Sequence, residues 1–514
     1  MPALSALRNS CTTVAAILAL QLSVNAQHHS QWVYADANGK LAYKTLPKGD
    51  KIMDFSYAGY MGGGVRIPVV PVQITIEPTA GDNTDLIQQA IDKVAGMPLR
   101  NGFRGTVLLS AGNYDCERAI NINTTGIVLR GSGSGEKGTI INMTGKPHVA
   151  VAIKGNVNYS TGNITATVTD DYIPSGALSF TVNKASAFAA GDTIRLTKKV
   201  TPEWVQFMGM DQMVRDGKQQ TWVSGEFTTD RVIRKISGNT ITVDVPLTDS
   251  YDTKFTGQTG TVVSKVSATG EISQVGVENL RIVSGSQSVT INDGHNRGLT
   301  INGAADAWIR DLVIFNTVNS ITLQGKRITA ENINLIHDVP TLGAAKPADL
   351  SANGSQLLFN KCNITGDNVF YLATGAKING PIVLLNCVFR GNGWIQPHQR
   401  WATGLLVDNC NVPTGGIDFM NRGSMGSGHG WAIGWAVAWN CTARSYLNQQ
   451  PPGAANWVIG SKGEHKQGAI PFEKDPMLPE GIYDSPGTPV APNSLYLAQL
   501  NERLGAEAVK NTGY

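Results

Sequence analysis

The sequence predicts an all-β fold, a parallel β-helix in which short strands stack coil upon coil as a solenoid. Three observations predict it: a high glycine content, an internal repeat in the second half of the chain, and an amphipathic helix near each end. The 514 residues include 57 glycines, and only 16% of them are charged. High glycine with moderate hydrophobicity is typical of many short strands joined by turns.

The internal repeat begins near residue 275. Each repeat contains a short segment in which a polar residue precedes an aliphatic residue or a cysteine. The polar residue is asparagine in several repeats. Their last residues are Leu280, Leu312, Ile333, Cys362, Cys387, Cys410 and Cys441, spaced 21 to 32 residues apart. Periods of this length are typical of solenoids and propellers. We expect these residues to form one inward column, and the asparagine amides to bond from coil to coil at about 4.8 Å.

The cysteines favour buried thiols over disulfides or a metal site. Cys11 lies in the expected signal peptide, which leaves an odd number, five, in the mature chain. Their spacing matches neither a zinc site nor a compact disulfide scaffold. Parallel neighbours in a column rarely meet disulfide geometry, so we expect these residues to act as small apolar side chains.

A helix is predicted near each end of the mature chain. The first begins at residues 82–84, where Asp, Asn and Thr are N-cap candidates, with Asp85 in the first turn. Its apolar face consists of Ile87, Ala90, Ile91 and Val94. The second covers residues 494–504, with Leu495, Ala498 and Leu504 on one face. Such helices would cover the open coils at the two ends of a solenoid.

Residues 158–268 differ in pattern from the repeat and predict a β-rich insertion. Apolar and polar residues alternate in several segments, as they do in antiparallel strands. Gly238–Asn239 predicts a hairpin-like break between two of them. The irregular segment from Trp204 to Trp222 is expected to overhang a groove of the main body.

Residues 1–26 predict a signal peptide, with Arg8 in the n-region, an apolar run over Val14–Leu22 and a small-residue cleavage site at Val24–Ala26. The protein is therefore expected to be secreted or periplasmic. Residues 27–157 are assigned to an N-terminal segment, the capping helix and the first coils. Residues 269–470 are assigned to the main β-helix with its groove, and residues 471–514 to a tail and the second capping helix.

Charge and hydropathy exclude some partners. The net charge is +3, from 42 Lys and Arg against 39 Asp and Glu, which favours neither nucleic acid nor a membrane surface. No segment after the signal peptide is long and apolar enough for a transmembrane helix. We expect a monomer.

Three segments carry a resemblance to a known family. They are Gly81–Asp92, Gly105–Tyr114 and Leu129–Gly133. Together they resemble the opening of the pectate-lyase-like (polysaccharide lyase-like) superfamily, over roughly residues 80–145. The resemblance implies a capping helix followed by a right-handed parallel β-helix. That superfamily contains polysaccharide lyases, polygalacturonase-like hydrolases, esterases, epimerases and phage tailspikes, so the fold alone does not determine the chemistry.

A second strand in each repeat can also be aligned. The predicted strands are Ser288–Ile291, Ser320–Leu323, Asn368–Leu372, Gly393–Gln396, Gly416–Met420 and Asn456–Ile459. The turns after them hold His295, Lys326 with Arg327, Thr374, His398 with Arg400, Asn421 with Arg422, and Lys462. Stacked coils would place these side chains along one edge of a groove. Arginine binds carboxylates bidentately and lysine adds charge, so the edge suits an acidic polysaccharide.

The densest part of this edge predicts an active site for β-elimination at a uronic acid. We expect His398 to remove the C5 proton, Arg400 and Arg422 to neutralise the carboxylate, and His429 to donate a proton or contact substrate. The two histidines can exchange roles. The expected substrate contacts are Trp394, Gln399, Trp401, Asn421, Trp431, Lys462, His295 and Lys326, with Trp435 as a further flat face for a sugar ring.

Two alternatives remain open. Gly428–Gly430 and Gly366–Asn368 resemble short motifs of polygalacturonases, which hydrolyse with paired aspartates. Here Asn368 replaces the second aspartate, which weakens that interpretation. The possible acids are Asp338, Asp349, Asp367 and Asp418. The other alternative is a β-helix that binds carbohydrate without catalysis. No cofactor is expected, and no metal, since no tight cluster of carboxylates marks a calcium site.

Overall fold

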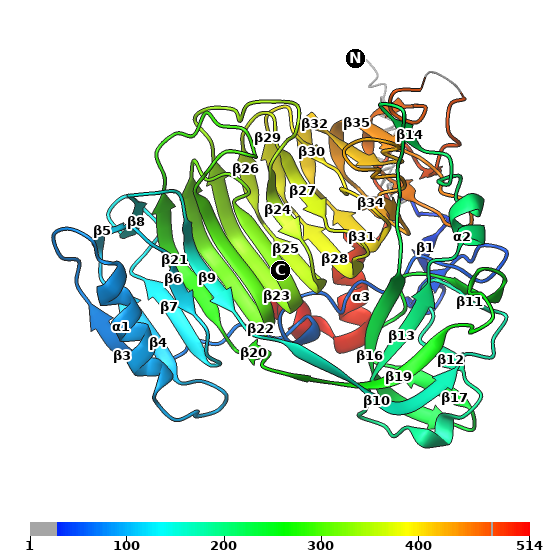
Figure 1. Ribbon diagram of the computed structural model, residues 1–514, viewed down its shortest axis with the longest axis horizontal. Helices are drawn as coiled ribbons and strands as arrows, with labels where there is room; N and C mark the ends of the chain where they lie inside the picture. The colour runs from blue at the N-terminus through cyan, green and yellow to red at the C-terminus, as the bar shows by residue number, and fades with distance from the viewer. Residues whose placement is uncertain (1–27, 474–475) are drawn as a thin grey trace, which may run out of the picture.

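The computed structural model describes residues 28–473 and 476–514, so the expected signal peptide lies outside the described residues. Figure 1 shows a long stack of strands with a smaller β-rich unit at one end. The main sheet assembly has 26 strands, and its strand pairs are parallel. The all-β class and the parallel arrangement are confirmed, whereas the right-handed sense of the coil remains a prediction. We call residues 72–154 and 272–484 the coiled body.

Three sheets run along the coiled body. The first contains β3 (Val72–Ile76), β4 (Gly105–Leu109), β7 (Ile127–Gly131), β25 (Ser355–Asn360), β28 (Asn379–Leu385), β31 (Ala402–Asp408), β34 (Val437–Trp439), β36 (Trp457–Ile459) and β38 (Ile482–Asp484). The second contains β5 (Gly112–Cys116), β8 (Thr139–Met143), β26 (Asn363–Thr365) and β29 (Val388–Arg390). The third contains β6 (Ile120–Ile122), β9 (Val149–Lys154), β24 (Ala348–Ala352), β27 (Phe370–Thr374) and β30 (Trp394–Ile395).

Several longer strands bend from one of these sheets into the next. They are β21 (Gly276–Val283), β22 (Arg297–Phe315), β23 (Ile321–Ile336), β32 (Asn411–Phe419), β35 (Thr442–Asn448) and β37 (Lys462–Lys466), while β20 (Ile272–Ser273) and β33 (Ile433–Gly434) lie in turns. Residues 288–291, which were predicted to form a strand, lie in an irregular loop instead. The predicted strand at residues 456–459 corresponds to β36 (Trp457–Ile459), which stacks on β34 in the first sheet and does not continue the third sheet.

The predicted inward column is confirmed. Leu280 pairs with Leu312, which pairs with Ile333 on the next coil. All seven residues of the column are buried in one hydrophobic core. The four cysteines of the column and Cys116 are free thiols. Burial raises the pKa of the Cys387, Cys410 and Cys441 thiols well above the ordinary value, so these sulfurs stay protonated and pack as apolar groups.

The predicted ladder of asparagine amides is confirmed at one step, where Asn332 Nδ2 donates to Asp311 Oδ1 on the preceding coil at 3.0 Å. The amides of Asn409 and Asn440 donate to the Asn493 carbonyl instead. Backbone groups bond the coils at these turns: the Asn386 N–H donates to Asp408 O at 3.0 Å, and the Asn409 N–H donates to Trp439 O at 2.9 Å. The residues at these positions have positive φ, 50° at Asn386 and 57° at Asn279. Asparagine tolerates the left-handed conformation better than most residues. The repeat therefore selects asparagine for backbone conformation.

A helix covers one end of the coiled body. Helix α1 (Thr84–Ala95) begins where predicted and buries the four residues of its predicted apolar face. These residues pack on the core of the first coils, and Figure 1 shows the helix across that end. None of the helices in the described residues is long and apolar enough to cross a membrane.

The C-terminal helix lies elsewhere than expected. Helix α3 (Leu495–Leu504) is followed by α4 (Ala506–Asn511). Its buried face contains Leu495 and Leu500, whereas Leu504 is 48% exposed, so the predicted apolar face is only partly right. The Tyr496 N–H donates to Asp408 Oδ2 in β31, and Asn360 in β25 donates to the Thr512 carbonyl. The helices therefore lie along the outside of the first sheet and do not cover the last coil.

An antiparallel unit interrupts the coiled body after β9; we call residues 158–269 the insertion. Its six-stranded sheet has the order β10 (Asn158–Thr167), β19 (Val262–Thr269), β13 (Thr193–Lys199), β16 (Glu226–Ser237), β17 (Thr240–Val243) and β12 (Ser179–Thr181). Smaller elements are the strand pairs β11 (Tyr172–Ile173) with β18 (Tyr251–Asp252) and β14 (Val214–Arg215) with β15 (Lys218–Gln219), and helix α2 (Pro202–Phe207). The insertion has a hydrophobic core of its own.

Candidate functional site

Two histidines meet where consecutive coils leave the third sheet. His398 lies in the loop after β30 and His429 in the loop after β32, and their ring centroids are 4.6 Å apart. Backbone bonds hold the loops together: the Arg400 N–H donates to His429 O at 2.9 Å, and the Arg422 N–H donates to Gly430 O at 2.7 Å. The structure thus brings together the four residues that the sequence proposed as catalytic.

Both imidazoles are neutral near neutral pH. Burial lowers the pKa of His398 to about 4, helped by the positive charges of Arg422 and Arg400. Burial and the adjacent His398 lower the pKa of His429 to about 3. His429 Nδ1 is buried and has no hydrogen-bond partner among the described residues. A neutral, partly buried imidazole can accept a proton from a bound molecule.

Arg422 is a buried cation with unused hydrogen-bonding capacity. Its side chain is 5% exposed, and its guanidinium lies 5.3 Å from the Phe370 ring centroid. Nη1 donates to the His398 carbonyl at 3.1 Å, while Nε is buried without a partner among the described residues. Burial lowers the pKa of Arg422 to about 10, which still leaves it charged. No carboxylate of the described residues forms an ion pair with this guanidinium, although the charge of Asp418 opposes the fall of its pKa. A buried charge without a direct ion pair is costly, so this group favours an anionic ligand.

A carboxyl group lies beside Arg422 on the outer face of the third sheet. Asp418 is 8% exposed, and Gln396 Nε2 donates to its Oδ2 at 2.8 Å. Burial raises the pKa of Asp418 to about 6, although Gln396, Lys466 and Arg422 oppose the rise. Sequence reasoning kept Asp418 only as an alternative acid and missed Gln396. The alternation of strand side chains, which puts Trp394 and Gln396 on one face, could have indicated it.

Arg400 is fully engaged by the protein. Its Nε donates to Trp222 O at 2.7 Å, and Nη1 donates to Gln399 Oε1 at 2.7 Å. Nη2 donates to the carbonyl and the hydroxyl of Ser427 at 3.0 and 2.7 Å. This guanidinium therefore ties the insertion to the loop of His429. Its three nitrogens are thus used within the protein, whereas Arg422 keeps an Nε without a partner among the described residues.

Comparisons with known proteins give only distant likenesses. No family model matches this chain, and no curated protein matches it. Among solved structures it is similar to the Gp54 tailspike of Acinetobacter baumannii bacteriophage AP22 in complex with A. baumannii capsular saccharide, at 12% identity and a TM-score of 0.30, covering 80% of this chain and 73% of that chain. It is also similar to the Azotobacter vinelandii mannuronan C-5 epimerase AlgE6 A-module, at 11% identity and a TM-score of 0.26, covering 80% and 87%.

The chain is also similar to the Pseudomonas phage phi297 tailspike gp61, with 11% identity, a TM-score of 0.34 and coverage of 79% of this chain and 74% of that chain. TM-scores this low say nothing about the chemistry of the site. The function has to be inferred from the residues of this chain.

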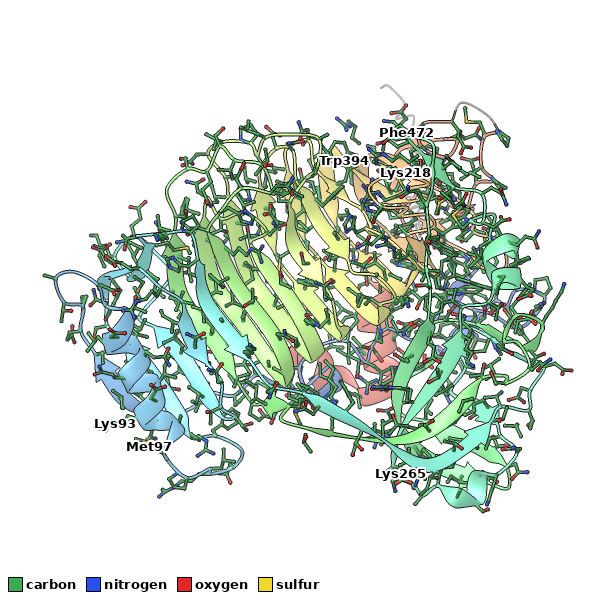
Figure 2. All side chains as sticks on the ribbon, viewed as in Figure 1. Lys93, Met97, Lys218, Lys265, Trp394 and Phe472 are labelled. Carbon is green, nitrogen blue, oxygen red and sulfur yellow. The ribbon has the colours of Figure 1, made fainter. Side chains whose placement is uncertain are left out.

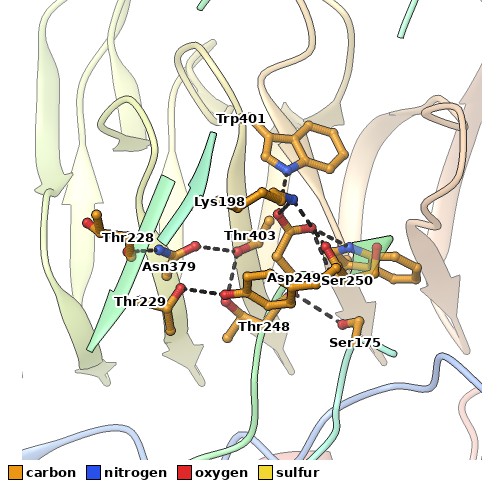
Figure 3. Close-up of polar contacts among 12 residues, drawn as sticks. Ser175, Lys198, Thr228, Thr229, Thr248, Asp249, Ser250, Asn379, Trp401 and Thr403 are labelled. Carbon is orange, nitrogen blue, oxygen red and sulfur yellow. Dashed lines mark hydrogen bonds and ion pairs between the residues drawn. The ribbon is translucent and has the colours of Figure 1, made fainter. Parts of the chain in front are cut away.

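Three tryptophans predicted to face sugar rings are structural. Trp401, Trp431 and Trp435 are at most 3% exposed, because the insertion covers them. The indole N–H groups of Trp401 and Trp435 donate to the Asp249 carboxylate, which also pairs with Lys198 at 2.7 Å (Figure 3). This burial argues against contact between these rings and a sugar in the groove, although Trp401 and Trp435 also line a separate cavity of about 390 Å³.

Trp394 is the exception among these rings. It is partly exposed, and the Lys346 ammonium lies 5.0 Å from its ring centroid. In Figure 2 it lies at the upper edge of the coiled body. Trp394 therefore remains a candidate for stacking against a sugar.

Two residues of the predicted edge lie elsewhere. Lys462 pairs with Thr442 in the second sheet, because the strand before it belongs to the first sheet. His295 precedes β22, so it lies at the opposite edge of the third sheet, where its Nδ1 contacts the Asp293 carbonyl at 2.8 Å. Neither residue joins the histidine pair.

The remaining predicted contacts are engaged within the protein. Lys326 is at the predicted edge and pairs with Glu271 at 3.0 Å. Asn421 is buried and accepts the Gly423 N–H, which shapes the loop. Gln399 accepts from Arg400.

The other candidate acids have their own partners. Asp349 is buried, pairs with His337 at 2.9 Å and accepts from Ser320. Asp338 accepts from Asn316, and Asp367 accepts the Asn392 N–H. Within the described ranges, no group of three or more His, Cys, Asp or Glu side chains is placed to hold a metal ion.

Proposed function

We propose that this protein is a secreted or periplasmic polysaccharide lyase, a right-handed parallel β-helix that cleaves a uronic-acid-containing polysaccharide by β-elimination. One observation carries the proposal: the buried Arg422 guanidinium, without a carboxylate partner among the described residues, lies against a pair of neutral histidines. A uronate carboxylate would form a direct ion pair with this guanidinium, and a neutral imidazole would supply the base.

In the proposed mechanism, Arg422 binds the carboxylate and stabilises the negative charge that develops when the C5 proton leaves. His398 accepts that proton. The electron pair of the C5–H bond then forms the C4–C5 double bond, and the C4–O bond breaks with its electrons on the leaving oxygen. His429 is neutral, so it can deliver a proton only after receiving one; protonated His398 protonates the leaving oxygen directly or through His429.

The test uses purified variants on a panel of polyuronates. Release of an unsaturated uronate, followed by its ultraviolet absorbance and by product mass, identifies a lyase. We expect His398→Ala and Arg422→Ala to lower turnover by about 10²–10³, the usual cost of losing a main charge stabiliser or base. Arg422→Lys should also be impaired, because lysine lacks the bidentate fork.

A folding check and a matched control make this test decisive. Lys93→Gln, an exposed change on α1, should act as wild type. Near wild-type turnover in both His398→Ala and Arg422→Ala would overturn the proposed site.

A glycoside hydrolase is the second candidate, and Asp418 favours it. A buried carboxyl with a pKa of about 6 suits a general acid. Saturated products, together with loss of activity in Asp418→Asn but not in His398→Ala, would establish hydrolysis. Binding of polysaccharide without any product would instead indicate a carbohydrate-binding β-helix.

A further inference from the structure

A second groove lies between the insertion and the coiled body. It is a cavity of about 600 Å³ whose lining includes Lys326 but none of the four residues expected to be catalytic. Its floor is formed where consecutive coils leave the third sheet. Lys154 pairs with Asn302, Asn302 pairs with Gln324, and the Asn353 N–H on the following coil donates to Leu323 O. One polar side chain thus follows another along the axis of the coils.

The amides of this floor are free to bind a ligand. The side chains of Asn302, Gln324 and Asn353 form no hydrogen bond with other described residues. Strands stack at about 4.8 Å, so the four floor side chains span about 14 Å. Glycine allows consecutive turns to approach closely, because a Cβ atom at Gly325 would lie only 2.1 Å from Ala304 O. A row of evenly spaced amide groups matches a polymer lying along the coil axis.

The opposite wall comes from the insertion and adds an aromatic ring. Tyr159 is 53% exposed, and the Arg195 guanidinium lies 4.6 Å from its ring centroid. Arg195 is held by Asp230 through two hydrogen bonds of 2.7 and 2.8 Å. An exposed aromatic ring beside amides and charges is typical of a site that binds sugar rings.

Charge favours an anionic occupant. Five cationic side chains and two carboxylates line the cavity: Lys154, Arg195, Arg231, Lys326 and Lys377, with Asp230 and Glu271. Some cations are engaged, since Lys326 pairs with Glu271 and Lys377 bonds carbonyls of the insertion. Lys154 is exposed and forms no ion pair among the described residues. The positive excess complements a carboxylate-bearing chain.

The groove ends next to the candidate site. The Lys377 N–H, at the far end of the cavity, donates to the carbonyl of Arg400 at 3.0 Å. Arg400 in turn holds the loop of His429. We infer that the groove between the insertion and the coiled body is an extended binding site for several consecutive sugars of an acidic polysaccharide. The inference rests on the proposed function for the class of polymer that the adjacent site processes.

Calorimetric titration in the His398→Ala background tests the inference without consuming the ligand. The probes are trimers and octamers of galacturonate and of mannuronate, with neutral oligosaccharides of equal length. We expect the octamer of the accepted uronate to bind at least about tenfold more tightly than its trimer. Tyr159→Ala and the double variant Asn302→Ala/Gln324→Ala should each weaken octamer binding by about tenfold and leave trimer binding unchanged.

Tyr34→Ala removes another exposed tyrosine, distant from the cavity lining, and serves as the matched control. Octamer affinities equal to the control in both groove variants would overturn the inference, as would equal binding of neutral octamers. A different result would overturn the proposed function without affecting this inference. If the His398→Ala protein turns over substrate like the wild type while groove variants still weaken octamer binding, the groove stands and the active-site assignment falls.

Discussion

At the scale of single residues, burial sets the charges of the candidate site. Desolvation favours the neutral form of each ionisable group, so it lowers the pKa of His398 and raises that of Asp418. Arginine has so high an intrinsic pKa that burial leaves Arg422 charged. The site therefore combines two fixed cations, Arg422 and Arg400, with groups that exchange protons in acidic solution.

The pH profile follows from these values. A base must be unprotonated, so we expect kcat/KM to rise as pH increases through about 4, the pKa of His398, and then to stay level through neutral pH. Measurements of uronate release from about one pH unit below that pKa to mildly alkaline pH provide the profile. A fall in activity above pH 6 would instead show that protonated Asp418 is needed, as in the hydrolase.

At the scale of elements, the short turns between the first and second sheets depend on backbone conformation. Asn279 has φ of 57°, in the left-handed region that β-branched residues avoid. We expect Asn279→Val to lower the free energy of unfolding by about 1–3 kcal/mol, while Asn279→Gly changes it little. Chemical denaturation of the two variants compares them directly. Equal stability of the valine and glycine variants would contradict the conformational explanation.

Asp249 of the insertion joins a buried ion pair within that unit to two tryptophans of the coiled body. Lys198 and Asp249 are each at most 7% exposed, and Asp249 also accepts from two tryptophans of the coiled body (Figure 3). Asp249→Asn would leave the Lys198 ammonium without its counter-charge. We expect a loss of about 3–5 kcal/mol in unfolding free energy. Limited proteolysis should also cut the insertion faster.

The exposed pair of Lys48 and Asp252, at 2.7 Å with Lys48 61% exposed, provides the control. Asp252→Asn should cost less than about 1 kcal/mol, because solvent screens an exposed pair. Equal effects of Asp249→Asn and Asp252→Asn would show that Asp249 does not stabilise the attachment of the insertion.

At the scale of the whole molecule, binding of an acidic polymer has to come from local charge. The net charge is only +3, whereas five cations against two carboxylates line the groove. We expect the KM for a long polyuronate to rise by about tenfold when ionic strength goes from about 0.01 M to about 0.15 M, since the Debye length falls from about 30 Å to about 8 Å. Steady-state kinetics should show kcat nearly constant. A KM insensitive to salt would contradict charge-based binding.

The candidate site shows which parts of a site can be predicted from a sequence. The repeat placed His398 and His429 on consecutive turns, and they lie together. The same alignment put Lys462 in the wrong sheet, because a two-residue alternation identifies the face of a strand and not the sheet to which it belongs. Because the turns vary in length, the sheet to which a strand belongs is known only once the strand pairing is known.

By itself, the sequence determined the periodic parts of this protein. The column of Leu280 to Cys441, helix α1 and the antiparallel pattern of the insertion follow from local spacing, because side-chain direction repeats with the backbone. Only the tertiary structure decided which groups are free to act. Arg400 is occupied, Arg422 is buried without a carboxylate partner among the described residues, and Trp401 lies under the insertion. Burial and pairing depend on contacts between segments far apart in the chain, which local spacing does not encode.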